Sequence, residues 1–329
     1  MSWAGKRVLV TGAGGFIGTH IVEGLVSRGA EVTALVRYNS RNDWGMLEPR
    51  YGTGTKGIRV IAGDVTDPGC VRRAVEGNEV VFHLAALIGI PYSYEAPESY
   101  VRTNLIGTLN VLQASLAAGV GRVVHTSTSE VYGTAIYTPI DEAHPLQGQS
   151  PYSASKIAAD KMAEAFYCSF GLPVVTLRPF NTYGPRQSAR AVIPTIITQA
   201  LTSDTIQLGS LDPVRDFTFV TDTARAFILA AEKDGAVGKV VHTGSGIGIS
   251  IGELARRVLA QVNPQAKIIS GEERVRPEKS EVMRLVCDSR RAWEELGWRP
   301  EVPIDEGLSR TIAWIRDNLD IYKAGRYTV

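Results

Sequence analysis

Short apolar runs recur along the first three-quarters of the chain, and they are the main structural signal in the sequence. Most are continuously apolar rather than alternating, which is typical of strands buried on both faces of a parallel sheet. The runs span residues 6–11, 31–36, 57–65, 79–86, 121–126, 172–178 and 240–245. Segments of helical length separate them, such as 19–28 and 104–119. This alternation predicts an α/β fold with a doubly wound parallel sheet.

The strict alternation loosens after residue 180, which predicts a second, smaller lobe towards the C-terminus. We expect the first lobe to contain residues 1–180 and a returning segment of about 216–246. The second lobe is then formed by 181–215 and 247–329. Ser250 precedes an apolar-periodic segment and is predicted to cap a helix.

Composition narrows the class of protein. The chain has 329 residues, of which 44% are hydrophobic and 21% charged, and its formal net charge is +1. Because no block of Lys or Arg stands out, we expect no binding to nucleic acid or to an anionic membrane. Three cysteines far apart predict reduced thiols, a cytoplasmic protein and no metal site. The N-terminus shows no signal peptide, and no apolar run reaches the roughly 18 residues of a membrane span.

A glycine motif follows the first predicted strand and opens the first helix. Gly12, Gly15 and Gly18 have the spacing Gly-x-x-Gly-x-x-Gly, with Phe16 and Ile17 at the start of the helix. Gly12 allows a tight turn, Gly15 lets a pyrophosphate approach the backbone, and Gly18 permits close helix packing. The strand, turn and helix together predict a dinucleotide-binding site.

The ends of the next strands supply the other candidate cofactor contacts. An acidic residue after the second strand would bind the ribose diol of NAD, but Arg37 stands there, with Ser40 and Arg41 nearby. This setting suits a ribose 2′-phosphate, so the cofactor is NAD or NADP with NADP favoured. Asp64 is expected to accept from the adenine amino group or, as an equal alternative, to cap a turn. Further contacts are expected from Val65, Leu84, Ala85 and Ala86.

The chemistry is predicted at the end of the fifth strand and on the helix after it. Tyr152 and Lys156 lie one helical turn apart, so the ammonium should lower the pKa of the phenol and make it a proton acceptor. Polar residues at the carboxyl end of a parallel strand are site candidates, and Thr128, Ser129 and Glu130 stand there. If the chain stays extended, Thr128 and Glu130 point the same way.

Other polar residues are candidates for contact with a substrate. The segment Gly89 to Tyr94 is expected to be a loop that faces the site through Ser93. Isolated arginines in irregular segments are what a diphosphate-bearing substrate needs in a nearly neutral protein. These are Arg186, Arg190, Arg215 and Arg276.

Several motifs in order carry a resemblance over essentially the whole chain. They are Gly12-x-x-Gly15-x-x-Gly18, the His83-Leu-Ala-Ala strand end, Thr128, Tyr152-x-x-x-Lys156, Arg178-Pro-Phe-Asn181-x-Tyr-Gly-Pro-Arg186 and Arg215-Asp-Phe. Together they resemble the extended short-chain dehydrogenase/reductase family that acts on nucleotide sugars. The resemblance implies a Rossmann-type cofactor lobe, a smaller lobe that binds the nucleoside diphosphate, oxidation of the sugar at carbon 4 by a tightly held nicotinamide cofactor, and a homodimer. The substrate contacts that it implies are Ser93, Ser129, Asn181, Arg186, Arg215 and Arg276.

Shorter sequence segments indicate which members of this family the chain resembles. Segments 85–94, 128–135, 145–155, 180–197 and 276–281 look like the 4,6-dehydratases of legionaminic acid biosynthesis, which act on a nucleotide-linked N-acetylglucosamine. The triplet Thr128-Ser129-Glu130 is also similar to that of GDP-mannose 4,6-dehydratases and UDP-glucuronate decarboxylases, and it differs from the Thr-Asp-Glu of dTDP-glucose 4,6-dehydratases. The choice between UDP and GDP stays open.

The resemblance implies a role for each catalytic residue. Tyr152 takes the proton of the 4-hydroxyl, Lys156 lowers the pKa of Tyr152 and holds the ribose, and Thr128 hydrogen-bonds the 4-oxygen. Glu130 removes the proton on carbon 5, and because Ser129 is a poor acid Glu130 also returns the proton. The alternatives are a nucleotide-sugar 4-epimerase, a UDP-glucuronate decarboxylase and a cofactor-sensing regulator without catalysis.

Overall fold

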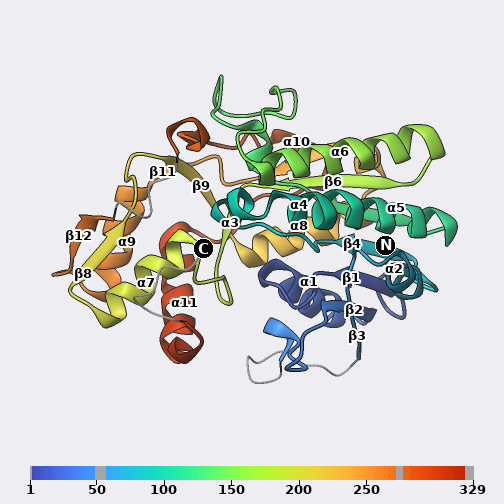
Figure 1. The fold of residues 1–329 in the computed structure, drawn as a ribbon, viewed down its shortest axis with the longest axis horizontal. Helices are drawn as coiled ribbons and strands as arrows, with labels where there is room; N and C mark the ends of the chain where they lie inside the picture. Colours follow the sequence, from blue (N-terminus) through green and yellow to red (C-terminus); the bar gives the residue numbers. More distant parts are fainter. Residues whose placement is uncertain (1, 49–56, 272–276, 323–329) are drawn as a thin grey trace.

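A computed structural model describes residues 2–48, 57–271 and 277–322 of the chain. Figure 1 shows a large lobe built around one sheet and a smaller lobe beside it. Among the described residues, no helix has the length and apolar character needed to cross a membrane.

The large lobe contains seven parallel strands in the order β10-β6-β5-β4-β1-β2-β3. Their bounds are β1 Arg7–Thr11, β2 Glu31–Arg37, β3 Ile58–Gly63, β4 Val80–His83, β5 Arg122–Thr126, β6 Val174–Pro179 and β10 Val240–Thr243. The order runs outward in both directions from β1, so the topological switch point, where ligands of such sheets bind, lies between β1 and β4. The predicted α/β fold with a doubly wound parallel sheet is confirmed.

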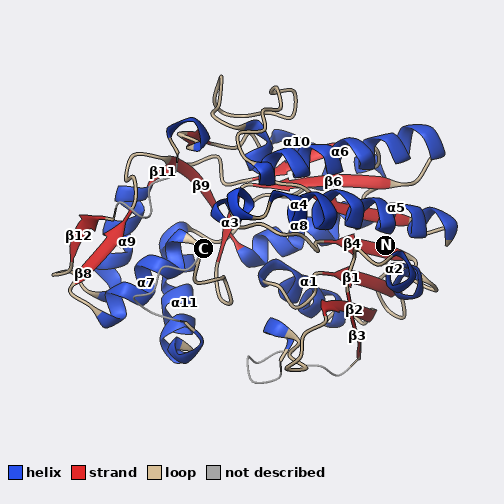
Figure 2. Ribbon diagram, in the orientation of Figure 1, coloured by secondary structure: helices blue, strands red, loops and turns tan. Residues whose placement is uncertain are grey.

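Helices cover both faces of this sheet (Figure 2). They are α1 Phe16–Val26, α2 Pro68–Val75, α5 Gly107–Ala117, α6 Pro151–Phe170, α8 Val220–Glu232 and α10 Arg290–Leu296. Side chains alternate along each strand, so Val8 and Val10 pack on the face of α1 and α8, while Leu9 packs with the other face. Burial on both faces explains why these strands are continuous apolar runs in the sequence.

The small lobe has its own apolar core between three helices and a short parallel pair of strands. The helices are α7 Val192–Thr202, α9 Ile251–Val262 and α11 Ile304–Asp317, and the pair is β8 Thr205–Leu208 with β12 Lys267–Ser270. A further sheet centres on β9 Val214–Phe219, which pairs with β7 Asn181–Tyr183, β11 Gly248–Ser250 and β13 Arg284–Leu285. Ser250 caps α9 as predicted, because its hydroxyl accepts from the Glu253 backbone N–H.

The C-terminal part of the chain does not all stay in the small lobe. Ala292, Leu296 and Trp298, in and just after α10, pack into the apolar core of the large lobe. Nothing in the local sequence pattern of this segment indicates which core it joins. The returning strand β10 pairs with β6 at the edge of the large sheet.

Two local predictions were wrong. The segment expected to be a loop at Gly89 to Tyr94 is mostly helical, α3 Ile90–Glu95, and Pro91 in its first turn favours that start. The helix expected to begin at Asn104 has an earlier start, with α4 Pro97–Tyr100 and a π-helical turn Val101–Ile106 leading into α5. In the described part of the chain, the remaining helical elements are short 3₁₀ turns, at Gly45–Leu47, Ser129–Tyr132, Asp234–Ala236, Glu278–Ser280 and Leu319–Ile321.

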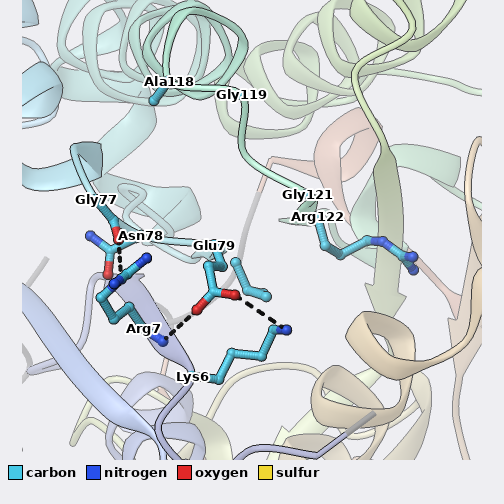
Figure 3. Close-up of a pocket in the computed structure, with 10 residues that line it drawn as sticks. Lys6, Arg7, Gly77, Asn78, Glu79, Ala118, Gly119, Gly121 and Arg122 are labelled. Carbon is cyan, nitrogen blue, oxygen red and sulfur yellow. Dashed lines mark hydrogen bonds and ion pairs between the residues drawn. The ribbon is translucent and has the colours of Figure 1, made fainter.

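A pocket of about 380 Å³ opens at the amino ends of the strands of the large sheet (Figure 3). Its charged groups are already paired: the Glu79 carboxylate lies 3.4 Å from Lys6 Nζ and accepts from the backbone N–H of Arg7. Ligands of open parallel sheets bind at the opposite, carboxyl ends. The functional site is therefore expected at those carboxyl ends.

Candidate functional site

The glycine turn between β1 and α1 is shaped to receive a pyrophosphate. Gly12 has φ of 68°, and a Cβ atom there would lie 2.8 Å from the backbone nitrogen of Ala85 at the end of β4. A Cβ at Gly18 would lie 2.3 Å from the Gly12 carbonyl oxygen, so glycine lets α1 pack directly on the turn. Gly15 is exposed at the N-cap, and the first turn of α1, which begins at Phe16 and Ile17, carries no acidic side chain. This backbone fits a dinucleotide phosphate at a helix N-terminus.

The ends of β3 and β4 lie at the same carboxyl edge of the sheet as the glycine turn. Leu84, Ala85 and Ala86 follow β4 and are partly exposed, and the backbone N–H groups of Leu84 and Ala85 are directed to the Thr11 hydroxyl. Val65 is buried behind them. Asp64 is exposed, and its Oδ1 accepts from the backbone and hydroxyl of Thr66. The turn-capping interpretation of Asp64 is therefore correct, and contact with adenine stays a prediction.

Arg37 is the last residue of β2, and its side chain is exposed. The loop after it is held by Asn39, whose side chain bonds the backbone of Arg41 and of Asp43. The loop packs against the glycine turn, since the Met46 N–H donates to the Gly14 carbonyl. The two exposed arginines, Arg37 and Arg41, thus stand on a structured loop beside the cofactor turn.

The triplet at the end of β5 turns immediately instead of remaining extended. Ser129–Tyr132 forms a 3₁₀ turn, and Thr128 caps it by accepting from the Glu130 N–H at 3.2 Å. The turn ends at Gly133, whose φ is 60°. The extended conformation on which the predicted geometry of Thr128 and Glu130 depended is therefore absent, because a Thr side chain can bond the backbone two residues on and compete with the strand.

Tyr152 and Lys156 lie in the first turns of α6, as predicted. The helix starts with a reciprocal capping box, in which Ser150 and Ser153 each bond the backbone N–H of the other. Both Tyr152 and Lys156 are buried. The Lys156 ammonium donates to the carbonyl oxygen of Thr126, the last residue of β5, at 2.6 Å. This bond ties the helix to the strand end that leads to Thr128.

The electrostatics around Tyr152 differ from the expectation. Burial raises the pKa of Tyr152, the hydrogen bond with the Thr128 hydroxyl acts in the opposite direction, and the Glu130 charge raises the pKa further. Burial also lowers the pKa of Lys156, to about 8. Proximity on the helix correctly predicted the pair but not the cost of desolvating both groups. The same interactions show that Thr128, Glu130 and Tyr152 meet in one site.

The predicted substrate residues have different surroundings. Ser93 is fully buried, and its hydroxyl donates to the Ile90 carbonyl. Ser129 is buried in the 3₁₀ turn Ser129–Tyr132, which we call the catalytic turn because it carries the candidate base Glu130. The amide nitrogen of Asn181, on β7, is buried and has no hydrogen-bond partner among the described residues. An unpartnered buried donor costs free energy, so Asn181 is well suited to meet a ligand.

Two of the predicted arginines are buried and paired with carboxylates. Arg186 lies 2.9 Å from Glu23 of α1, and its φ of 71° is rare for a residue with a side chain. Arg215, on β9, lies 3.5 Å from Glu281. The register pairs Asn181 with Phe217, so Arg215 stands two residues away on the neighbouring strand. Arg190 is exposed, and Arg276 lies outside the described residues.

Comparison with known proteins agrees with this geometry. The family model described as GDP-mannose 4,6 dehydratase matches residues 9–311. The chain belongs to this family. The resemblance to extended short-chain dehydrogenases/reductases is confirmed, and the link to legionaminic acid biosynthesis stays a prediction. A dTDP-glucose 4,6-dehydratase from Actinoplanes sp. is 34% identical over 325 residues, covering 95% of this chain and 98% of that protein.

Solved structures of the family are also similar. An epimerase from Methanothermobacter thermautotrophicus has a TM-score of 0.89 and 28% identity, covering 97% of this chain and 94% of that one. A dTDP-glucose 4,6-dehydratase from Streptomyces venezuelae, solved with NAD bound, has a TM-score of 0.86 and 31% identity, covering 96% and 99%. The protein is thus an enzyme of the nucleotide-sugar dehydratase and epimerase family.

Sequence reasoning missed two residues at this family site. Asp160 is buried one turn beyond Lys156, and Tyr100 packs its ring edge-on to Tyr152 with ring centroids 6.2 Å apart. The Tyr100 hydroxyl donates to the Gly89 carbonyl. Asp160 was detectable, because residues 152, 156 and 160 share one helical face. Tyr100 gave no such signal, since it comes from a helix that was not predicted.

Proposed function

We propose that this protein is a nucleotide-sugar 4,6-dehydratase that acts on UDP- or GDP-linked N-acetylglucosamine. The observation that supports this most is the position of Glu130. Its carboxylate is close enough to raise the pKa of Tyr152, while the Thr128 hydroxyl bonds the same phenol. The phenol that we assign as proton acceptor for the 4-hydroxyl therefore lies beside a carboxylate that can take the proton on the neighbouring carbon 5.

The chain's own residues divide the proton transfers between them. Tyr152 takes the proton of the 4-hydroxyl, and Thr128 hydrogen-bonds that oxygen as it becomes a ketone. The ketone acidifies the proton on carbon 5, which Glu130 removes as the C6–O bond breaks and a double bond forms between carbons 5 and 6. Because Ser129 is a poor acid, Glu130 passes its proton to the departing hydroxyl and water leaves.

The last step restores the enzyme. Carbon 5 takes up a proton as hydride reaches carbon 6. The proton that Tyr152 received from the 4-hydroxyl is released at this stage, either directly to the sugar or to solvent, so Tyr152 returns to its starting state. When bound, a nicotinamide dinucleotide accepts the hydride of carbon 4 and returns it to carbon 6, and the positive charge of its oxidised ring favours a phenolate nearby. Gly12, Gly15 and Gly18 would hold its pyrophosphate.

The nucleoside diphosphate is assigned to residues at the junction of the two lobes. The unpartnered amide of Asn181 is a donor for a phosphate or sugar oxygen. Arg186 and Arg215 supply positive charge from the same junction, and a guanidinium binds phosphate with two parallel hydrogen bonds. Arg276 is proposed from the resemblance alone.

Product mass tests the proposed reaction. We expect the purified enzyme to convert UDP-N-acetylglucosamine or GDP-N-acetylglucosamine to a product lighter by one water, which also identifies the donor. The alternative is a 4-epimerase, and the likeness to the Methanothermobacter epimerase favours it as the second candidate. An unchanged mass with the 4-epimer visible by NMR would establish the epimerase and leave Glu130 without its role.

We further propose that the cofactor is NADP, although the Streptomyces relative contains NAD. Arg37 and Arg41 are exposed on the structured loop after β2. Removing one charged hydrogen bond in the Arg37→Glu variant should weaken NADP binding roughly tenfold to hundredfold, and should not weaken NAD binding. Calorimetric titration of each cofactor measures both, with Arg59→Glu as a charge-matched control on β3.

The wild-type titration already discriminates between the cofactors. If NAD binds more tightly than NADP to the unaltered protein, Arg37 does not serve as a phosphate ligand. Equal losses of NAD and NADP affinity in Arg37→Glu would instead mean that Arg37 only shapes the loop.

A further inference from the structure

Beneath the catalytic pair, Asp160 is the centre of a buried polar network. It lies four residues after Lys156 on α6, and its side chain is 3% exposed. One carboxylate oxygen accepts from His125 Nε2 at 3.0 Å. The other accepts from Ser127 Oγ at 2.5 Å and from two nitrogens of Arg178, at 3.1 and 2.9 Å. Both oxygens are thus satisfied without any group from the substrate side.

The partners of Asp160 flank the residue that orients Lys156. His125 and Ser127 stand on either side of Thr126, whose carbonyl oxygen accepts from Lys156 Nζ at 2.6 Å. Asp160 therefore fixes the strand end on both sides of the acceptor, while its own helix carries the donor. Loss of these bonds would free the two ends of the Lys156 contact to move independently.

The same network extends to the catalytic turn. Arg178 Nη1 donates to the Tyr132 hydroxyl at 2.6 Å, and Tyr132 is the last residue of the turn that carries Ser129 and Glu130. The other two nitrogens of the Arg178 guanidinium, Nε and Nη2, donate to Asp160. The α6 helix, the end of β5 and the catalytic turn are thus joined through one carboxylate.

Charge provides a second link between Asp160 and Lys156. Burying an ammonium disfavours its charged form, and a nearby carboxylate opposes that effect. Asp160 is the one charge that raises the pKa of Lys156 among the described residues. The titratable groups around the pair include His83 on β4, His125 on β5 and Arg178 on β6. The phenols of Tyr132 and Tyr152 also interact with the Asp160 charge. Burial lowers the pKa of both histidines, and the Asp160 charge raises the pKa of Arg178.

We propose that Asp160 is a positioning residue that keeps Lys156 charged and holds the strand end and the catalytic turn against α6. The proposal rests on the proposed function only for its effect on turnover. The charge state of Lys156 is a property of the protein itself, and it can be measured without substrate.

NMR of the lysine side chains tests the proposal directly. Protein labelled with ¹³C at the lysine Cε is titrated from about pH 6 to about pH 11, and the Lys156 signal is assigned by its absence from Lys156→Gln. In Asp160→Asn the midpoint of Lys156 should fall by about one pH unit or more. The matched control is Glu164→Gln, an exposed acid on the same helix, which should leave the midpoint unchanged.

Kinetics give the second readout. Lys156 loses its charge as pH rises through its pKa, so a lower pKa moves the alkaline fall of kcat to lower pH. Asp160→Asn should therefore lose kcat on the alkaline side first, with KM for the nucleotide sugar unchanged. Glu164→Gln should retain the wild-type profile.

A double variant separates the effect of Asp160 on Lys156 from a loss of folding. Asp160→Asn leaves Arg178 buried without its charge partner, which can unfold the protein, whereas the double variant Asp160→Asn, Arg178→Gln removes both charges. If Lys156 titrates as in wild type in whichever of these variants folds, the proposal is overturned. If the titration moves but no nucleotide sugar is turned over by wild type, the positioning role stands and the proposed function fails.

Discussion

Replacing Tyr152 with Phe should lower kcat by roughly 10²- to 10⁴-fold, because the 4-hydroxyl loses the group that takes its proton. Phe keeps the ring and its edge-on contact with Tyr100, so the fold and nucleotide-sugar binding should be retained. Steady-state rates measure the loss, and calorimetry with the nucleotide sugar measures binding. The result applies equally to a dehydratase and an epimerase, since both begin with oxidation at carbon 4.

Tyr100→Phe is the matched control for this substitution. It removes a hydroxyl one ring away that donates only to the Gly89 carbonyl among its described contacts. We expect it to retain most of the activity. Comparable losses in both variants would show that the site responds to disturbed packing, and wild-type turnover in Tyr152→Phe would remove Tyr152 from the mechanism.

Glu130→Gln should separate the two halves of the reaction. Without a carboxylate to take the proton on carbon 5, water release should fall by roughly 10²- to 10⁴-fold. Oxidation at carbon 4 should continue, because Tyr152 and Thr128 are unchanged. The absorbance of reduced nicotinamide should therefore rise on mixing with substrate and persist, whereas it returns to baseline in wild type.

Glu98→Gln is the control for the loss of a carboxylate, because Glu98 is exposed and pairs only with Arg102 among its described contacts. It should release water at the wild-type rate. The assignment of Glu130 is wrong if Glu130→Gln also does so. Persistence of epimerisation in Glu130→Gln, with no dehydration in either protein, would instead favour the epimerase.

Features that depend on local pattern were predictable from the sequence. The strands of the large sheet are buried on both faces, so their apolar runs were visible, and Gly12 stands where a positive φ and a close approach to Ala85 exclude other residues. Tyr152 and Lys156 were found because four residues make one helical turn. The turn at Thr128 was missed because one side-chain hydrogen bond decides between strand and turn.

Features that depend on burial or on distant partners were not predictable. The pKa of Tyr152 follows from desolvation, which no spacing of residues reveals. Glu23 and Arg186 are separated by most of the first lobe in sequence, so their contact appears only in the fold. Trp298 joins the large core for the same reason. The homodimer implied by the resemblance, and the division of residues between lobes, stay predictions.

The carboxylates beside Arg186 and Arg215 affect which anions can bind at the junction of the two lobes. Arg186 already lies beside Glu23, and Arg215 lies beside Glu281. The negative charges of these carboxylates reduce the attraction of the two arginines for anions from solution. A single weak anion has little to gain by competing with a carboxylate at one arginine. A diphosphate bound as proposed would contact both arginines and the Asn181 amide, so the number of simultaneous contacts, rather than charge alone, would decide which anion binds there.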